Sequence, residues 1–184
     1  MDFLNPYELT VLDWIREHIA CSFLDVVMPV VTDFCEGGIG CILIAVVLLF
    51  FKKTRKAGIT MGAALLIGLL LCNLTLKPLI ARTRPFTFNP DITLIIPQPS
   101  EYSFPSGHSV AAFEGAFSIF LYNRKWGIPA LVFAVLIALS RLYLYVHYPT
   151  DVIAGSILGC LFAWTAYLLV NWCEKLYKAK KQTL

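Results

Sequence analysis

Charged residues are scarce in this chain. Only 15% of its 184 residues are Asp, Glu, Lys or Arg, whereas 58% are hydrophobic. A soluble domain carries about 25% charged residues, so this composition argues against an ordinary water-soluble fold. Several apolar runs instead approach the roughly 20 residues that span the hydrocarbon core of a bilayer. We therefore expect an all-α, polytopic membrane protein that forms one domain over residues 1–184.

The chain also lacks the patterns of several other protein classes. Its six cysteines form no CxxC pair and lie mostly in apolar segments, which argues against a disulfide framework or a zinc site. The net charge is only +3, and the basic residues cluster at the ends of apolar runs rather than in a nucleic-acid-binding stripe. The first residues lack the cleavage site of a signal peptide, so we expect the N-terminus to be retained.

The apolar pattern predicts six transmembrane helices after an N-terminal interfacial helix. Residues 1–20 are expected to lie in the membrane interface, because apolar residues recur there at three- and four-residue steps (Leu9, Leu12, Ile15, Ile19). The six expected spans cover about residues 22–34, 39–51, 57–76, 108–123, 126–144 and 150–172. The first is short and contains two aspartates, Asp25 and Asp33. The long polar stretch 77–107 is expected to be a functional loop, and residues 173–184 a basic cytoplasmic tail.

Six spans would place both termini on the same side of the membrane. Eleven lysines and arginines would then lie on that side, and only four on the other. The positive-inside rule makes the first side cytoplasmic. The four basic residues outside are Lys77, Arg82, Arg84 and Arg141, and they need another explanation.

Three of these cations, Lys77, Arg84 and Arg141, belong to three short polar motifs. The predicted topology places all three motifs at one face of the membrane. A fixed charge at the edge of a hydrophobic protein is costly unless it faces a polar cavity or a partner. Lys77, Arg84 and Arg141 have no matching set of acids in the sequence, which indicates an anionic ligand, and their side chains suit phosphate oxygens. A single arginine in such a place is more often a topology anchor, and we interpret Arg82 as a lipid-headgroup contact.

Two of the three histidines accompany these cations. Ser106-Gly107-His108 lies where the loop becomes a helix, so Ser106 is a candidate N-cap and the helix N-terminus a candidate anion site. His147 precedes Asp151 by four residues, one helical turn, which lets the carboxylate hold one ring nitrogen while the other attacks. His108 then suits the general acid.

A metal site is the competing explanation for these histidines. Two histidines and one aspartate could form a facial triad around a metal ion. Three neighbouring cations would repel such an ion and already supply the charge neutralisation that it would bring. We therefore expect no metal and no other cofactor.

The three motifs together resemble the signature of the type 2 phosphatidic acid phosphatase superfamily, K-x6-RP, PSGH and SR-x5-H-x3-D, with every signature position filled between residues 77 and 151. The family includes bacterial lipid phosphatases, glucose-6-phosphatase and vanadium haloperoxidases. The resemblance implies that His147 attacks phosphorus to form a phosphohistidine, that Asp151 orients it, and that His108 protonates the leaving oxygen. It further implies a phosphate site built from Lys77, Arg84, Ser106, Gly107 and Arg141.

These observations predict a lipid phosphatase whose active site faces the extracytoplasmic side of the cell membrane. The partners are then a phosphorylated lipid and membrane lipids. Undecaprenyl diphosphate is the first choice of substrate, with phosphatidylglycerophosphate, phosphatidic acid and lipid A as alternatives. The spans argue against a soluble haloperoxidase, and a non-catalytic lipid-phosphate binding or transport protein would need only the cations.

Three further polar residues have no assigned role. Glu114 lies inside the fourth expected span, where it could pair with Arg141 or serve as a structural acid. Glu101 and Tyr102 precede the second motif and could gate or contact the substrate.

Overall fold

The computed structural model describes residues 5–89 and 91–182, and every regular element in these two ranges is helical. The expected all-α class is therefore confirmed. In chain order the elements are α1 (Asn5–His18), α2 (Ser22–Asp33), η2 (Glu36–Gly38), α3 (Ile39–Phe50), α4 (Arg55–Gly68), η3 (Leu69–Leu76), α5 (Lys77–Ile80), η4 (Pro85–Thr87), α6 (Gly107–Tyr122), α7 (Arg124–Tyr143) and α8 (Pro149–Gln182). Residues 1–4 of the expected interfacial helix and residues 183–184 of the expected tail lie outside these ranges.

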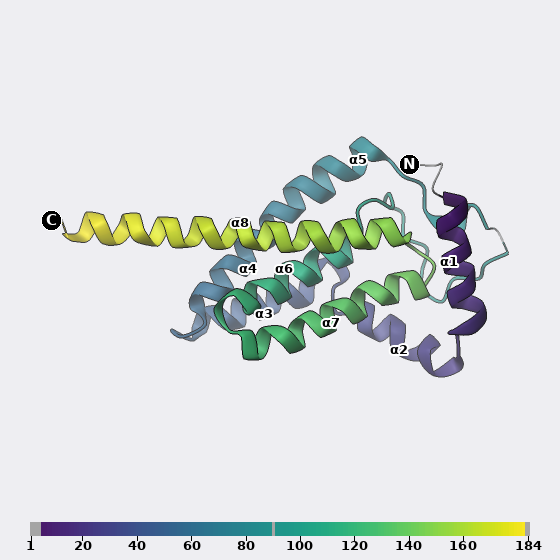
Figure 1. Cartoon of the computed structure of the whole chain (residues 1–184), viewed down its shortest axis with the longest axis horizontal. Coiled ribbons are helices and arrows are strands. Elements are labelled where there is room, and N and C mark those ends of the chain that lie inside the picture. The colour runs from purple at the N-terminus through teal and green to yellow at the C-terminus, as the bar shows by residue number, and fades with distance from the viewer. Residues whose placement is uncertain (1–4, 90, 183–184) are drawn as a thin grey trace.

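Helix α6 lies at the centre of the bundle and packs against α4, α7 and α8 (Figure 1). Two glycines allow α8 to approach α6 closely. A Cβ atom on Gly155 would lie 2.7 Å from the carbonyl oxygen of Ser106, and one on Gly159 would lie 2.5 Å from that of Val110. Small residues permit such close helix contacts within a membrane. They hold the Pro-Ser-Gly-His motif, which begins α6, against the first turns of α8.

The outer surface of the bundle is apolar. Large hydrophobic side chains on several helices are about half exposed, among them Val46, Leu66, Val132, Leu139 and Leu168. Soluble monomers rarely expose apolar surface on this scale. Four helical stretches are long and apolar enough to cross a membrane: Ser22–Phe50, Arg55–Thr87, Arg124–Tyr143 and Pro149–Lys181. These observations support a multi-pass membrane protein.

The first two expected spans correspond to two short helices. The segments 22–34 and 39–51 become α2 and α3, which follow each other along the bundle through the turn η2 (Figure 1). Each has 12 residues, or about 18 Å of helix, which is less than the roughly 30 Å of a hydrocarbon core. Together they form one apolar stretch, Ser22–Phe50, that is long enough to cross a membrane once.

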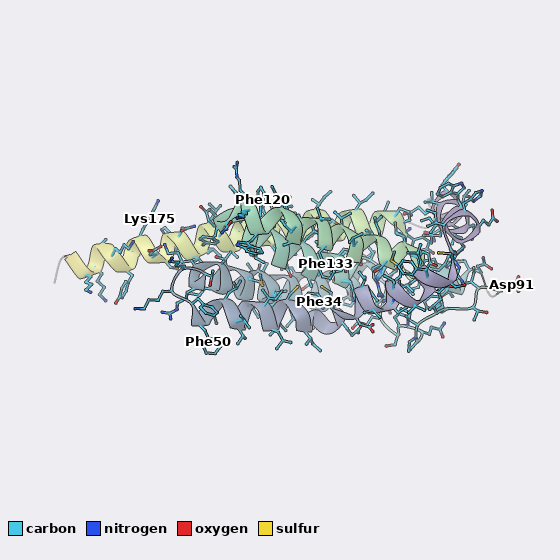
Figure 2. All side chains as sticks on the ribbon, turned by 90° about the horizontal axis from the view of Figure 1, so that it is seen from below. Phe34, Phe50, Asp91, Phe120, Phe133 and Lys175 are labelled. Carbon is cyan, nitrogen blue, oxygen red and sulfur yellow. The ribbon has the colours of Figure 1, made fainter. Side chains whose placement is uncertain are left out.

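The described helices nearest the two termini lie at opposite ends of the bundle. Helix α1 lies across one end, and the C-terminal part of α8 extends from the opposite end (Figure 1). Figure 2 labels a residue near each end, Asp91 and Lys175. That both termini lie on one side of the membrane stays a prediction. If the two bundle ends face opposite sides, Arg16 of α1 joins the four outer cations, which gives ten basic residues against five.

The apolar stripe of α1, which was expected to lie in the membrane interface, packs onto the protein. Leu12 is fully buried and clusters with Tyr145 and Tyr148 of the α7–α8 connection, and Leu9 packs against the same cluster. The stripe therefore attaches α1 to the bundle. The outward face of the helix carries other exposed apolar side chains: Tyr7, Val11 and Trp14.

Candidate active site

One cavity of about 840 Å³ brings the predicted cations and histidines together. It is lined by α2, η2, η3, α6 and α7 and by part of the connection between α5 and α6. Five predicted groups lie on its wall: Lys77, Arg84, His108, Arg141 and His147. Gly107 lines it as well, whereas Ser106 and Asp151 lie behind the wall and are completely buried.

The first motif places two buried cations on this wall. Lys77 begins α5, and its Nζ binds the carboxylate of Glu101. Arg84 follows four residues after α5 and is fixed by backbone carbonyls. Its Nε donates to the Glu101 carbonyl at 2.7 Å, and its Nη1 donates to the Val146 carbonyl at 2.9 Å. Nη1 also lies 3.2 Å from Nε2 of His147.

Arg141 contributes the third cation from the last turn of α7. The residue is only 2% exposed, and its Nη1 donates to Thr32 Oγ1 on α2 at 2.6 Å. Its Nε has no hydrogen-bond partner in the part of the chain that the structure describes. Buried donors are almost always paired, so this shielded N–H leaves hydrogen-bonding capacity unused on a guanidinium that lines the cavity. The possible Glu114–Arg141 pair is not formed, because Glu114 packs against Gly68 of α4.

The second motif caps α6 as expected. Ser106 is the N-cap, and its Oγ accepts from the backbone N–H and the hydroxyl of Ser109 at 3.4 and 3.1 Å. The hydroxyl of Ser106 is thus used inside the helix cap. A Cβ atom at Gly107 would lie 3.5 Å from Lys77 Nζ, an ordinary contact. His108 projects into the cavity, where its Nε2 lies 3.2 Å from Oε2 of Glu36.

The third motif orients a neutral imidazole. Nδ1 of His147 lies 3.4 Å from Asp151 Oδ2 and 3.4 Å from Ser103 Oγ. Since the guanidinium of Arg84 can only donate, the geometry assigns the ring proton to Nδ1 and a lone pair to Nε2. Burial lowers the pKa of His147 to about 3, so the ring is uncharged at neutral pH. Its lone pair lies at the cavity wall.

Two residues beside this imidazole were not recognised in the sequence. The hydroxyl of Ser103 donates to Asp151 Oδ2 at 2.5 Å, and Arg82 Nη1 donates to Asp151 Oδ1 at 2.5 Å. Arg82 is only 3% exposed, so its interpretation as a lipid-headgroup contact is wrong. Ser103 lies in an irregular connection whose sequence has no periodicity that would indicate which side chains turn inward. The sequence does contain a clue to the role of Arg82, because Arg82 stands two residues before Arg84 of the first motif.

The cavity also contains acids that the sequence analysis did not match to the cations. Asp33, Glu36 and Glu101 all line it, and Glu101 and Glu36 contact Lys77 and His108. The hydrogen bond from Lys77 lowers the pKa of Glu101, which keeps this carboxylate ionised. The Glu101 carboxylate therefore binds a cation that could also bind a phosphate. The described residues contain no cluster of three or more His, Cys, Asp or Glu that could hold a metal ion.

Comparisons with known proteins agree with this site. The sequence profile of the PAP2 superfamily matches residues 57–175, which include all three motifs. An undecaprenyl-diphosphatase of Sulfolobus acidocaldarius is 41% identical over 70% of this chain and 61% of its own length. The undecaprenyl-diphosphatase BcrC of Bacillus subtilis is 33% identical over 86% of this chain and 84% of its own length.

A solved structure extends the likeness to the whole fold. The crystal structure of the PAP2-type phosphatidylglycerolphosphate phosphatase of Bacillus subtilis superposes with a TM-score of 0.73. It is 28% identical and covers 95% of this chain and 88% of its own. The profile match spans more than half of the chain, and the bundle has the fold of a solved membrane phosphatase. The chain therefore belongs to the PAP2 superfamily of membrane phosphatases, as its three motifs predict.

Proposed function

We propose that this protein is a metal-independent lipid phosphatase that transfers the phosphoryl group of its substrate to His147. The observation that carries the proposal is the position of the His147 imidazole. Its Nε2 lies at the wall of a cavity that three cations line, while its Nδ1 faces a buried carboxylate. A neutral imidazole oriented in this way is an activated nucleophile, and the cations stabilise the negative charge of the phosphoryl group.

The first step forms a phosphohistidine. The Nε2 lone pair of His147 attacks the terminal phosphorus, and the bond from that phosphorus to the leaving oxygen breaks. In a lipid diphosphate this is the bridging anhydride oxygen, which leaves as part of the lipid monophosphate, and in a lipid monophosphate it is the ester oxygen. His108 donates a proton to that leaving oxygen, as a general acid on the same cavity. The carboxylate of Asp151 supports the positive charge that develops on the imidazole.

The second step releases phosphate. Neutral His108 takes a proton from water, whose oxygen attacks phosphorus while the bond to His147 Nε2 breaks. Both histidines return to their starting states, and the net reaction consumes one water molecule per phosphate. Throughout both steps Lys77, Arg84 and Arg141 bind the phosphoryl oxygens, with Gly107 at the N-terminus of α6. Ser106 supports this site by capping α6.

Undecaprenyl diphosphate is the substrate that we propose first. Two relatives that carry this activity in their names support it, and one of them aligns along most of both chains. The cavity has an apolar wall of Pro29, Ile42, Leu65 and Leu69, beside which a lipid tail would lie. Phosphatidylglycerophosphate is the alternative that the solved relative supports. Phosphatidic acid and lipid A complete the set of candidates.

We further propose that the cavity faces the extracytoplasmic side. The basic clusters Lys52–Lys56, Arg124–Lys125 and Lys175–Lys181 lie at the opposite end of the bundle from α1 (Figure 1). Under the positive-inside rule that end is cytoplasmic. This orientation suits an enzyme that recycles a lipid carrier on the outer face of the membrane.

A phosphate-release assay tests the activity. Purified protein in detergent with EDTA is given each of the four candidate lipids, and free phosphate is measured over time. We expect release from undecaprenyl diphosphate, and a loss of about 10³-fold or more in His147→Ala, because the nucleophile is gone. A labelled substrate should leave an acid-labile, alkali-stable phosphoprotein in the wild type.

His18→Ala is the matched control, since His18 is exposed on α1 and does not line the cavity. It should retain full activity. Undiminished phosphate release in His147→Ala would contradict the mechanism. Tight lipid binding without release by the wild type would instead favour a binding or transport protein.

A further inference from the structure

The carboxylate of Asp151 is held on both of its oxygens. Oδ2 accepts from Ser103 Oγ at 2.5 Å and from the Tyr148 N–H at 3.0 Å, beside the His147 ring. Oδ1 accepts from Arg82 Nη1 at 2.5 Å. Since one edge of the carboxylate faces the imidazole and the other faces Arg82, the guanidinium fixes the plane in which Asp151 meets the nucleophile.

Arg82 is itself fixed from several directions. Its side chain is 1% exposed, and its guanidinium carbon lies 3.8 Å from the centroid of the Tyr148 ring. Its backbone carbonyl accepts from the N–H of Ser103 at 2.8 Å. Arg82 therefore positions both Asp151 and Ser103, the serine that donates to the Asp151 carboxylate.

Helix α1 completes this arrangement. Arg82 Nη2 donates to Glu8 Oε2 at 2.5 Å and to Asn5 Oδ1 at 2.8 Å. The other Glu8 oxygen accepts from the N–H and the hydroxyl of Thr150, at 2.8 and 2.7 Å. Thr150 lies in the first turn of α8, directly before Asp151. Glu8 therefore holds the arginine and the helix end that carries the aspartate at the same time.

The charges of Asp151, Arg82 and Glu8 determine the electrostatic environment of the His147 imidazole. Arg82 alone would cancel the charge of Asp151, and an uncompensated guanidinium next to it would weaken its support for a positive imidazole. Glu8 neutralises Arg82, so the group of three keeps one negative charge for His147. Other titratable or charged side chains that face this group are Arg84, Arg141, His108 and Tyr148.

We infer that Arg82 and Glu8 are positioning residues for the nucleophile, which makes the N-terminal helix α1 part of the catalytic assembly. The inference rests on the proposed role of His147. Neither Arg82 nor Glu8 lines the cavity, so both act through Asp151 rather than on the substrate.

Kinetics on the full-length protein test this role. Arg82→Lys keeps the charge but loses the planar fork, and we expect kcat to fall about 10- to 100-fold, the effect of one charge-assisted hydrogen bond. KM should stay within about twofold, because no contact with substrate changes. Asp13→Asn is the matched control: Asp13 also ties α1 to the α7–α8 connection, through the Tyr145 hydroxyl at 2.7 Å, but does not contact Arg82 or Asp151.

The titration of His147 gives a second readout that a merely structural role would not produce. It is followed by NMR of histidine-labelled protein in detergent micelles, with the signal assigned by its loss in His147→Gln. Arg82→Met removes a positive charge and should move the midpoint to higher pH. Arg82→Met combined with Glu8→Gln removes one charge of each sign and should return the midpoint toward that of the wild type.

The inference is overturned if Arg82→Lys has the kcat of the wild type, or if Asp13→Asn loses as much. It is also overturned if the His147 midpoint is the same in the wild type and in Arg82→Met. The proposed function fails separately, when the wild type releases no phosphate from any lipid. In that case the NMR titration still decides whether Arg82 and Glu8 control the imidazole.

Discussion

At the scale of single residues, the site is built around an imidazole that is kept neutral by its surroundings. Burial removes the water that would stabilise a positive ring, and the neighbouring guanidinium of Arg84 adds repulsion. Asp151 opposes both effects but does not outweigh them. In the proposed mechanism the ring can therefore attack phosphorus at neutral pH without a base to remove a proton.

Low pH should destabilise the folded protein because His147 binds a proton more readily in the unfolded chain. The pKa of His147 falls from 6.5 in an exposed imidazole to about 3 in the folded state. The unfolded chain therefore binds a proton first, and stability is lost as the pH falls from 6.5 toward 3. We expect the Tm in detergent to drop over this window in the wild type, and to drop less in His147→Gln. A control, His18→Gln, should follow the wild type, and identical profiles for all three proteins would contradict the prediction.

Glu101 should compete with the substrate for Lys77. Its carboxylate binds Nζ of Lys77, and the Glu101 side chain is 65% exposed. In Glu101→Gln we expect KM to fall a few-fold with little change in kcat, because an exposed ion pair of this kind is worth about 1 kcal/mol or less. Steady-state kinetics would measure both constants. Asp91→Asn, on the same exposed connection, is the control, and a higher KM in Glu101→Gln would refute competition.

At the scale of the elements, the close contact of α6 and α8 determines where the second and third motifs meet. The second motif ends in the first turn of α6 and the third motif ends in the first turn of α8, and Ser106 N–H donates to the Asp151 carbonyl at 3.1 Å. Glycines at the contact allow this hydrogen bond between two helix ends. The relative position of His108 and His147 is thus set by helix packing rather than by a flexible loop.

A methyl group at this contact should therefore destabilise the protein. In Gly159→Ala the new Cβ would lie 2.5 Å from the Val110 carbonyl oxygen, which forces α8 away from α6. We expect a loss of about 1–3 kcal/mol, as for other overpacked sites. Gly62→Ala on α4 is the control, because its Cβ would meet no atom within 4 Å. Thermal unfolding in detergent measures both, and equal stability of the two variants would count against the close contact.

The elements also show what the sequence can and cannot predict. Apolar runs predicted the helical bundle, and three fixed spacings predicted the groups on the cavity wall, since both depend on local patterns. The joining of α2 and α3 depends on the turn η2, whose two glycines, Gly37 and Gly38, adopt positive φ angles of 55° and 73°. No apolar pattern reveals that such a turn continues one crossing instead of reversing it.

The contacts of Ser103, Arg82 and Glu8 were missed for a related reason. They join α1, the connection between α5 and α6, and the start of α8, which lie far apart in the sequence. The amphipathic pattern of residues 1–20 leaves Glu8 on the polar face of α1. It could not predict that the buried partner of this polar face is an arginine 74 residues away.

At the scale of the whole molecule, we expect α1 and the end of α8 to lie on opposite sides of the membrane, because they lie at opposite ends of the bundle (Figure 1). Single cysteines in a cysteine-free background test this. Glu17→Cys on α1 should react with a membrane-impermeant maleimide added outside intact cells, and Lys175→Cys on α8 only after permeabilisation. Both residues are exposed. Labelling of both positions from the same side would restore the six-span topology.

Helix α8 is long enough to reach well past the bilayer. Its 34 residues correspond to about 51 Å of helix, against a hydrocarbon thickness of about 30 Å. Near its exit from the bundle, Glu174 binds both Lys56 of α4 and Lys178 one turn further on. Glu174 therefore links the first turn of α4 to the part of α8 that extends beyond the bundle. A fluorescent protein or affinity tag joined after the final turns of α8 would stand clear of the lipid headgroups and of the catalytic end.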